Sequence, residues 1–158
     1  MRYASNNSST SKGAALSSSW NAFLVLGAAL SAVAAALHFA CIFWGAPGFR
    51  FLGAGEPIAQ MAERGHWYPS FIAFVIGALL MVWATYALSG AGLLVKLPFV
   101  RLVLSTITGI YLLRALVFPL LKPAFPGNSD TFWMVTSGIC LVIGLIHLVG
   151  LRQVWSQL

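Results

Sequence analysis

Four apolar stretches, separated by shorter polar connections, dominate the pattern along this chain. They cover residues 20–44, 69–88, 98–118 and 131–151, and the first two contain no Lys, Arg, Asp or Glu. A helix rises about 1.5 Å per residue, so each stretch is long enough to cross a hydrocarbon core about 30 Å thick. We therefore predict an all-α fold, a polytopic membrane four-helix bundle.

Residues at the borders of these stretches suit helix ends in a membrane. Trp20 and Trp44 bracket the first stretch, as aromatic anchors at the two interfaces would. Pro98 is tolerated in a first helical turn, and Pro119 is expected to end the third helix. Asp130 precedes the fourth stretch, where we expect it to cap the helix and complement its dipole.

The first 19 residues are rich in Ser and Asn and have no apolar period. They are predicted to form a disordered cytoplasmic tail before a single four-span membrane domain, residues 20–158. A signal peptide is the alternative for the first stretch, because Ala34-Ala35-Ala36 resembles a cleavage site. The apolar run continues to Trp44, much longer than a signal-peptide core of about 7–15 residues, which favours a span.

Composition and charge agree with an integral membrane protein. Hydrophobic residues make up 59% of the chain and charged residues 8%, which would leave a soluble domain with too much apolar surface. Eight of the nine Lys and Arg residues divide five to three between the side of the termini (Arg2, Lys12, Lys96, Arg101, Arg152) and the other side (Arg50, Arg64, Lys122). The positive-inside rule then places both termini in the cytoplasm, and we expect the bacterial inner membrane. The net charge of +6 indicates contact with the lipid bilayer and no nucleic-acid partner.

Small residues recur at a spacing of four, which brings helices close together in a membrane. These rows are Gly27, Ser31 and Ala35 in the first stretch, Ala73 and Gly77 in the second, and Ser105 and Gly109 in the third. We interpret them as seams between helices of one chain. The alternative is that one seam is the face of a homodimer.

The connection 45–68 is too long for a turn and too polar for a span. Pro57 suits a first helical turn and Gly65 a helix end, so the pattern predicts a short interfacial helix. This helix is expected either to cover the bundle only or to shape an entrance for a substrate.

Five polar residues form the candidate binding cluster: His38, Arg50, Glu56, Tyr111 and Arg114. His38 lies about 27 Å along the first helix and Arg114 about 24 Å along the third, which runs in the same direction, so both reach the outer leaflet. The connection that begins there adds Arg50 and Glu56. We predict that Glu56 pairs with Arg114, either as a structural clamp or as part of a pocket.

Nothing in the sequence predicts a cofactor or a metal. The three histidines, His38, His66 and His147, form no close-spaced metal motif, and a depth difference of about 20 Å separates His38 from His147. Cys41 and Cys140 are isolated, so dithiol chemistry is not indicated.

Three segments carry a family resemblance: residues 50–56 (RFLGAGE), 87–92 (ALSGAG) and 111–114 (YLLR). With them the chain resembles small uncharacterised four-helix integral membrane proteins of bacteria over most of its membrane region. The resemblance implies the fold and brings no activity with it.

The leading hypothesis for function is a protein without catalytic activity that binds a lipid-like molecule or a membrane-protein partner, with a homodimer as one form. It rests on abundant packing seams and few catalytic groups. The second hypothesis is a small transporter or channel subunit with a basic outer entrance. The third is a membrane enzyme with His38 as base, Arg114 holding an anionic lipid-like substrate and Glu56 orienting one of them.

Overall fold

The computed structural model describes residues 20–124 and 127–158, so the predicted tail, residues 1–19, lies outside the described residues. Within them the helices are α1 (Ala22–Trp44), α2 (Ala46–Phe51), α3 (Glu56–Glu63), α4 (Trp67–Gly90), α5 (Val100–Leu116), α6 (Phe118–Leu121), the 3-10 helix η1 (Lys122–Ala124) and α7 (Asp130–Val154). No strand occurs in this part of the chain. The predicted all-α class is confirmed.

Three helices, α1, α4 and α7, are long and apolar enough to cross a membrane. A fourth candidate consists of α5 continued by α6 and η1, with a bend of 65° between its two parts. The 17 residues of α5 alone rise only about 25 Å, less than a typical hydrocarbon core. Length and composition therefore support a membrane protein with three or four spans.

The bend in the fourth candidate follows from Pro119. Proline has no N–H to donate, and its ring conflicts with the carbonyl four residues earlier, here that of Ala115. The last regular bond of α5 joins the Val117 N–H to the Leu113 carbonyl at 2.9 Å. A new helix then begins at Phe118. The third span was predicted as one helix over 98–118. In the structure α5 covers only Val100–Leu116, and the chain bends by 65° before it continues as α6.

Two helix starts differ from the sequence prediction. Ser129 caps α7, because its side chain accepts from the N–H of Phe132 at 3.1 Å, whereas Asp130 is the first helical residue and pairs with Lys122. The prediction that Asp130 is the cap was wrong. Pro98 also lies outside its helix, since α5 begins at Val100 after Phe99 in the left-handed region (φ 56°).

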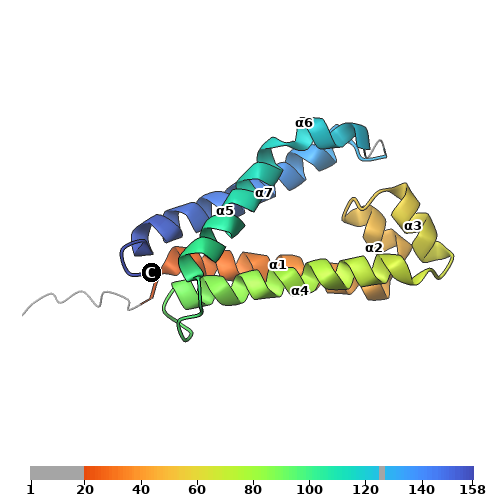
Figure 1. The fold of residues 1–158 in the computed structure, drawn as a ribbon. Helices are drawn as coiled ribbons and strands as arrows, with labels where there is room; N and C mark the ends of the chain where they lie inside the picture. The colour runs from red at the N-terminus through yellow and green to blue at the C-terminus, as the bar shows by residue number, and fades with distance from the viewer. Residues whose placement is uncertain (1–19, 125–126) are drawn as a thin grey trace, which may run out of the picture.

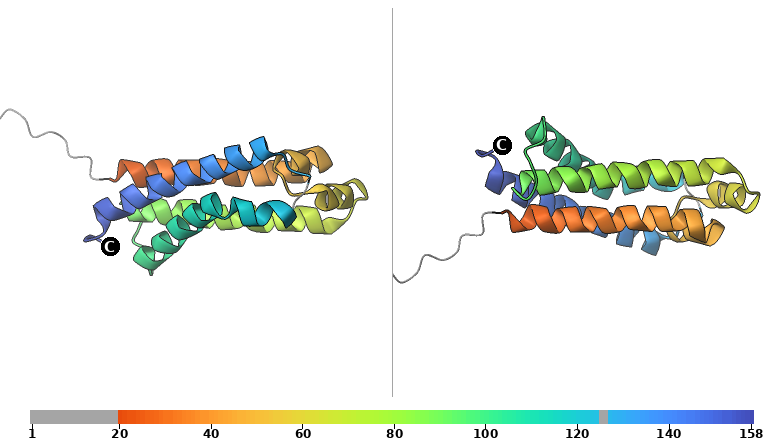
Figure 2. Two further views of the ribbon diagram at one scale, coloured as in Figure 1. Left: turned by 90° about the horizontal axis from the view of Figure 1, so that it is seen from above. Right: turned by 90° about the horizontal axis from the view of Figure 1, so that it is seen from below.

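The long helices form two pairs, α1 with α4 and α5 with α7 (Figure 1). The described chain starts and finishes at one end of the molecule, called here the terminal end, and the other end, which carries α2, α3 and α6, is called the loop end. The pairs meet at the terminal end and diverge toward the loop end, and the views along the perpendicular direction show one pair stacked over the other (Figure 2). One hydrogen bond links the two pairs at the loop end: the side chain of Asn128, just before α7, donates to the Gly53 carbonyl at 3.0 Å.

Glycine makes the contacts between helices close. A Cβ on Gly27 of α1 would lie 2.6 Å from Cε1 of His147 in α7, and a Cβ on Gly77 of α4 would lie 2.6 Å from the ring of Phe39 in α1. The rows through Gly27 and Gly77 therefore do form seams. The row through Gly109 does not, because Gly109 is exposed and nothing lies within 4 Å of a Cβ there.

Candidate functional site

Arg50 joins the two short helices at the loop end. Its Nε and Nη2 donate to the two carboxylate oxygens of Glu56 at 2.9 and 2.7 Å, and its Nη1 donates to Glu63 at 2.8 Å. Glu56 and Glu63 are seven residues apart, two turns of α3, so both face the same direction. The sequence did not predict α2, which is the element that brings Arg50 to this face.

The predicted pairing of Glu56 with Arg114 was wrong. Both oxygens of Glu56 are bonded to Arg50, which the six-residue separation and the intervening turn bring within reach. The hydrogen bonds from Arg50 hold the pKa of the Glu56 carboxyl below its ordinary value. Since these side chains are 41% and 49% exposed, the pair is a surface contact that orders α2 against α3.

An apolar cavity of about 320 Å³ lies beneath these two helices. It is enclosed by the second half of α1, the first half of α4, α2 and the start of α3, and its lining includes Phe49, Ile58, Ile72 and Ala73. His38 is the polar side chain of this lining, beside the thiol of Cys41. The cavity is thus a hydrophobic volume with a single imidazole, a composition typical of small-molecule sites.

The hydrogen bonding of His38 fixes what its ring can offer. Nδ1 lies 2.8 Å from the carbonyl oxygen of Ala34, one turn earlier in α1. A carbonyl only accepts, so we assign the proton of the neutral ring to Nδ1, and Nε2 keeps a lone pair. A neutral His38 is therefore a hydrogen-bond acceptor for a group that enters the cavity.

Tyr111 does not join His38 or the Arg50 cluster. Its hydroxyl is 3.0 Å from Oγ of Ser31, and its ring is stacked on His147 at 5.5 Å and meets Trp83 edge to face at 5.4 Å. With only 6% of its surface exposed, Tyr111 is a core residue that ties α5 to α1, α4 and α7. Tyr111 was predicted to join the outer polar cluster, but its contacts are with Ser31, Trp83 and His147 in the core.

Arg114 stands apart from the other candidates. Its guanidinium carbon lies 5.1 Å above the ring of Trp133 in α7, and its Nη1 is buried without a hydrogen-bond partner among the described residues. Ser137, one turn after Trp133, also has a buried hydroxyl without a partner there. The predicted cluster is thus divided: Arg50 and Glu56 are bonded, His38 faces a cavity, Tyr111 is in the core and Arg114 belongs to the second helix pair.

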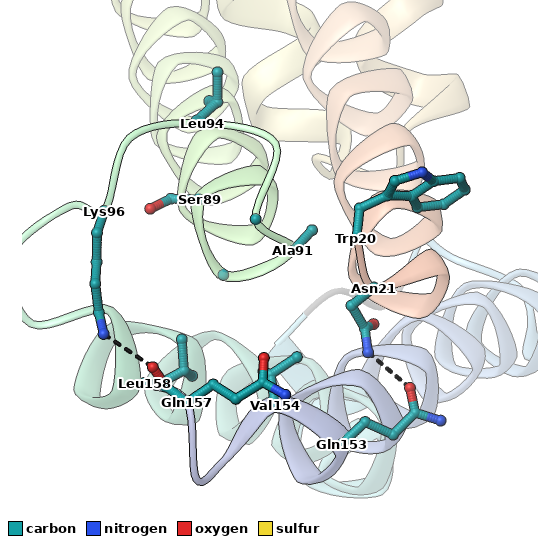
Figure 3. Close-up of a pocket in the computed structure, with 12 residues that line it drawn as sticks. Trp20, Asn21, Ser89, Ala91, Leu94, Lys96, Gln153, Val154, Gln157 and Leu158 are labelled. Atoms are coloured by element: carbon teal, nitrogen blue, oxygen red, sulfur yellow. Dashed lines mark hydrogen bonds between the residues drawn. The ribbon is translucent and has the colours of Figure 1, made fainter. Parts of the chain in front are cut away.

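A second cavity, of about 470 Å³, opens at the terminal end (Figure 3). Its polar groups bond to one another: Asn21 donates to Gln153 at 2.7 Å, Lys96 donates to the Gln157 carbonyl at 3.0 Å, and Ser89 accepts from the N–H of Leu97 at 3.0 Å. These contacts tie the ends of α1, α4 and α7 together. None of these contacts was predicted from the sequence, although Asn21, directly before the first residue of α1, is a residue type that caps helices.

Comparisons with protein-family models, with curated proteins and with solved structures find no match for this chain. Its function is therefore inferred from the chemistry of the two ends. At the terminal end the polar groups are already used in structural contacts. At the loop end an apolar volume meets an imidazole with an available acceptor atom. No group of three His, Cys, Asp or Glu residues suited to a metal occurs within residues 20–124 and 127–158.

Proposed function

We propose that this chain is an integral membrane protein of four spans that binds a lipid-like molecule in the cavity beneath α2 and α3, without catalysing a reaction. The single observation that carries this proposal is the apolar cavity of about 320 Å³ with His38 in its lining. An apolar tail suits the aliphatic lining, and a hydroxyl or amide N–H of the ligand can donate to Nε2 of His38.

The proposed orientation puts both termini in the cytoplasm and the loop end outside, in a bacterial inner membrane. The distribution of charge supports it. All three acidic residues of the chain, Glu56, Glu63 and Asp130, lie at the loop end, where each pairs with a base. Lys96 and Arg101, at the terminal end, instead donate to backbone carbonyls. An end with uncompensated bases suits the anionic cytoplasmic surface.

In this orientation α3 is the predicted interfacial helix. Its exposed face carries polar residues such as Gln60, while Ala59 is fully buried against the molecule. Trp67 and Tyr68 follow it at the start of α4, and both are exposed, as side chains at a membrane interface are. The helix thus closes the cavity on the side that faces the headgroups.

The paired state of Arg50 favours binding over anion transport. A basic outer entrance requires cationic groups that are free to attract an anion. Arg50 is bonded to two carboxylates, so this cluster of three side chains carries a net negative charge. The Arg50 cluster itself therefore offers little attraction for an anion.

Photolabelling tests the proposed ligand site. The full chain is placed in vesicles that contain a long-chain alcohol with a diazirine on its tail, and the labelled peptides are identified by mass spectrometry. We expect labels on the segments of α1 and α4 that line the cavity. Ile58→Trp fills the cavity from α3 and should reduce this labelling to background, whereas Gln60→Trp, on the exposed face of the same helix, should not.

A second pair of variants tests the role of His38. His38→Leu keeps the shape of the lining but removes the acceptor, so labelling by the alcohol should fall about fivefold, the value of one ordinary hydrogen bond. His66→Leu, at an exposed position, is the matched control. Labelling that is equal in Ile58→Trp and the parent protein would rule out this cavity as the binding site.

A further inference from the structure

Arg114 is a cation inside an apolar helix without an acidic partner. It lies 14 residues after the first residue of α5, about 21 Å along the helix. The three acids of the chain are all engaged elsewhere, two with Arg50 and one with Lys122. A guanidinium that has lost part of its hydration and gained no counter-charge favours an anion from outside the chain.

The surroundings of Arg114 supply a second donor. Trp133, whose ring lies under the guanidinium, is three residues after the first residue of α7, so the charged group is within about 5 Å of the loop end of that helix. Ser137 lies one turn after Trp133, on the same face of α7. Ser137 is only 6% exposed, and its hydroxyl has no hydrogen-bond partner among the described residues.

Arg101 on the same helix shows the arrangement that Arg114 lacks. Its guanidinium carbon lies 4.7 Å from the ring of Trp155, the residue directly after α7, and its Nη2 donates to the Trp155 carbonyl at 2.7 Å. Both arginines thus stack on a tryptophan in or next to α7, but among the described residues only Arg101 donates to an acceptor there. Nη1 of Arg114 is therefore a buried donor that makes no hydrogen bond within the described residues.

We infer that Arg114 and Ser137 form a binding site for an anionic oxygen group, a phosphate or a carboxylate, at the loop end of the α5 and α7 pair. The planar guanidinium provides parallel N–H donors to two oxygens, and the Ser137 hydroxyl provides one more. The ring of Trp133 keeps the guanidinium in place. The anion comes either from a lipid headgroup or from solution, and this site is separate from the cavity of His38.

Native mass spectrometry and thermal unfolding of the full chain in nanodiscs test this inference. One set of discs contains phosphatidylcholine with phosphatidylglycerol, and a second contains phosphatidylcholine alone with added inorganic phosphate. Arg114→Gln should weaken anion binding about a hundredfold, while Arg101→Gln, the matched control, should bind the anion like the parent protein. Retention of phosphatidylglycerol identifies a lipid headgroup as the source, and stabilisation by inorganic phosphate identifies a soluble anion.

Ser137→Ala separates anion binding from a structural role. This substitution breaks no hydrogen bond recorded for the described residues, so without an anion the variant should be as stable as the parent protein or more so. Its anion affinity should nevertheless fall about tenfold. The inference is overturned if neither anion binds, or if the parent protein, Arg114→Gln and Ser137→Ala bind equally.

Discussion

The terminal end and the loop end of this molecule are held together in different ways. At the terminal end the two helix pairs touch directly: α1 passes so close to α7 that Gly27 faces the ring of His147, and Gly150 of α7 faces Leu24. At the loop end the pairs diverge, and Asn128 and Phe132 meet Gly53 across the gap. The terminal end is thus held by direct packing of helices, whereas Asn128 and Phe132 hold the loop end through Gly53.

Charge follows the same division. The ion pairs of the loop end are local, since Arg50 binds the two glutamates of α3 and Lys122 binds the first residue of α7. None of these pairs joins the two helix pairs to each other. We therefore expect the terminal end to carry most of the stability and the loop end to open more easily, which suits the ligand site proposed there.

The largest effect is expected from Gly27→Ala. The added Cβ would lie 2.6 Å from Cε1 of His147, a ring that is fully buried and has little space to move. We expect a loss of about 1–3 kcal/mol of unfolding free energy, the usual cost of overpacking a core. Reversible unfolding in mixed micelles measures it.

Gly109→Ala is the control for this substitution. It adds the same methyl group to α5 at a position with nothing within 4 Å. Because alanine favours a helix over glycine by about 1 kcal/mol, stability should stay equal or rise slightly. Equal losses in both variants would contradict the assignment of stability to the terminal end, and a loss in Gly109→Ala alone would instead indicate the homodimer face considered from the sequence.

Much of this fold could be predicted, because lipid imposes a strong pattern. The lengths of α1, α4 and α7 follow from uncharged or nearly uncharged apolar runs, and small residues at a spacing of four identified the row through Gly27. The ends were less predictable. Ser129 and Asp130 are both good caps by type, and only the backbone geometry decides between them.

The candidate site was predicted less well, for two physical reasons. Depth along a helix gives height in the membrane but not direction around the axis, so Tyr111 and Arg114 were grouped although one is in the core and the other stacks on Trp133. The short helix α2 has only six residues and no clear period, and without it Arg50 could not be seen as the nearer partner of Glu56.

A smaller effect is expected from Gly53→Ala at the loop end. Gly53 has a φ of 72°, which costs a residue with a side chain about 1–2 kcal/mol, and a Cβ there would overlap the ring of Phe132. The ring is only partly buried and can turn away, so the bridge should open without global unfolding. Hydrogen exchange should rise at residues 128–133 with little change in α1. Global destabilisation as large as that of Gly27→Ala would show that the two ends contribute equally.

The smallest effect is expected from the surface pair of Arg50 and Glu56, and it should depend on pH. Because the bonds from Arg50 lower the pKa of Glu56 in the folded protein, the contribution of the pair is fully present above the ordinary carboxyl value of about 4.3. It is lost as the pH falls through the lower, folded pKa. Amide exchange in α2 and α3 should therefore increase, relative to its intrinsic rate, when the pH falls below about 4.

Glu56→Gln should show this looser state at every pH and lose much of the pH dependence. Added salt should reduce the difference between Glu56→Gln and the parent protein. Gln60→Glu removes the hydrogen bond from Nε2 of Gln60 to Glu56 and places a second carboxylate one turn away, so it should raise the pKa of Glu56 and move the loosening to a higher pH. An identical pH profile in Glu56→Gln and the parent protein would mean that the pair does not order the loop end.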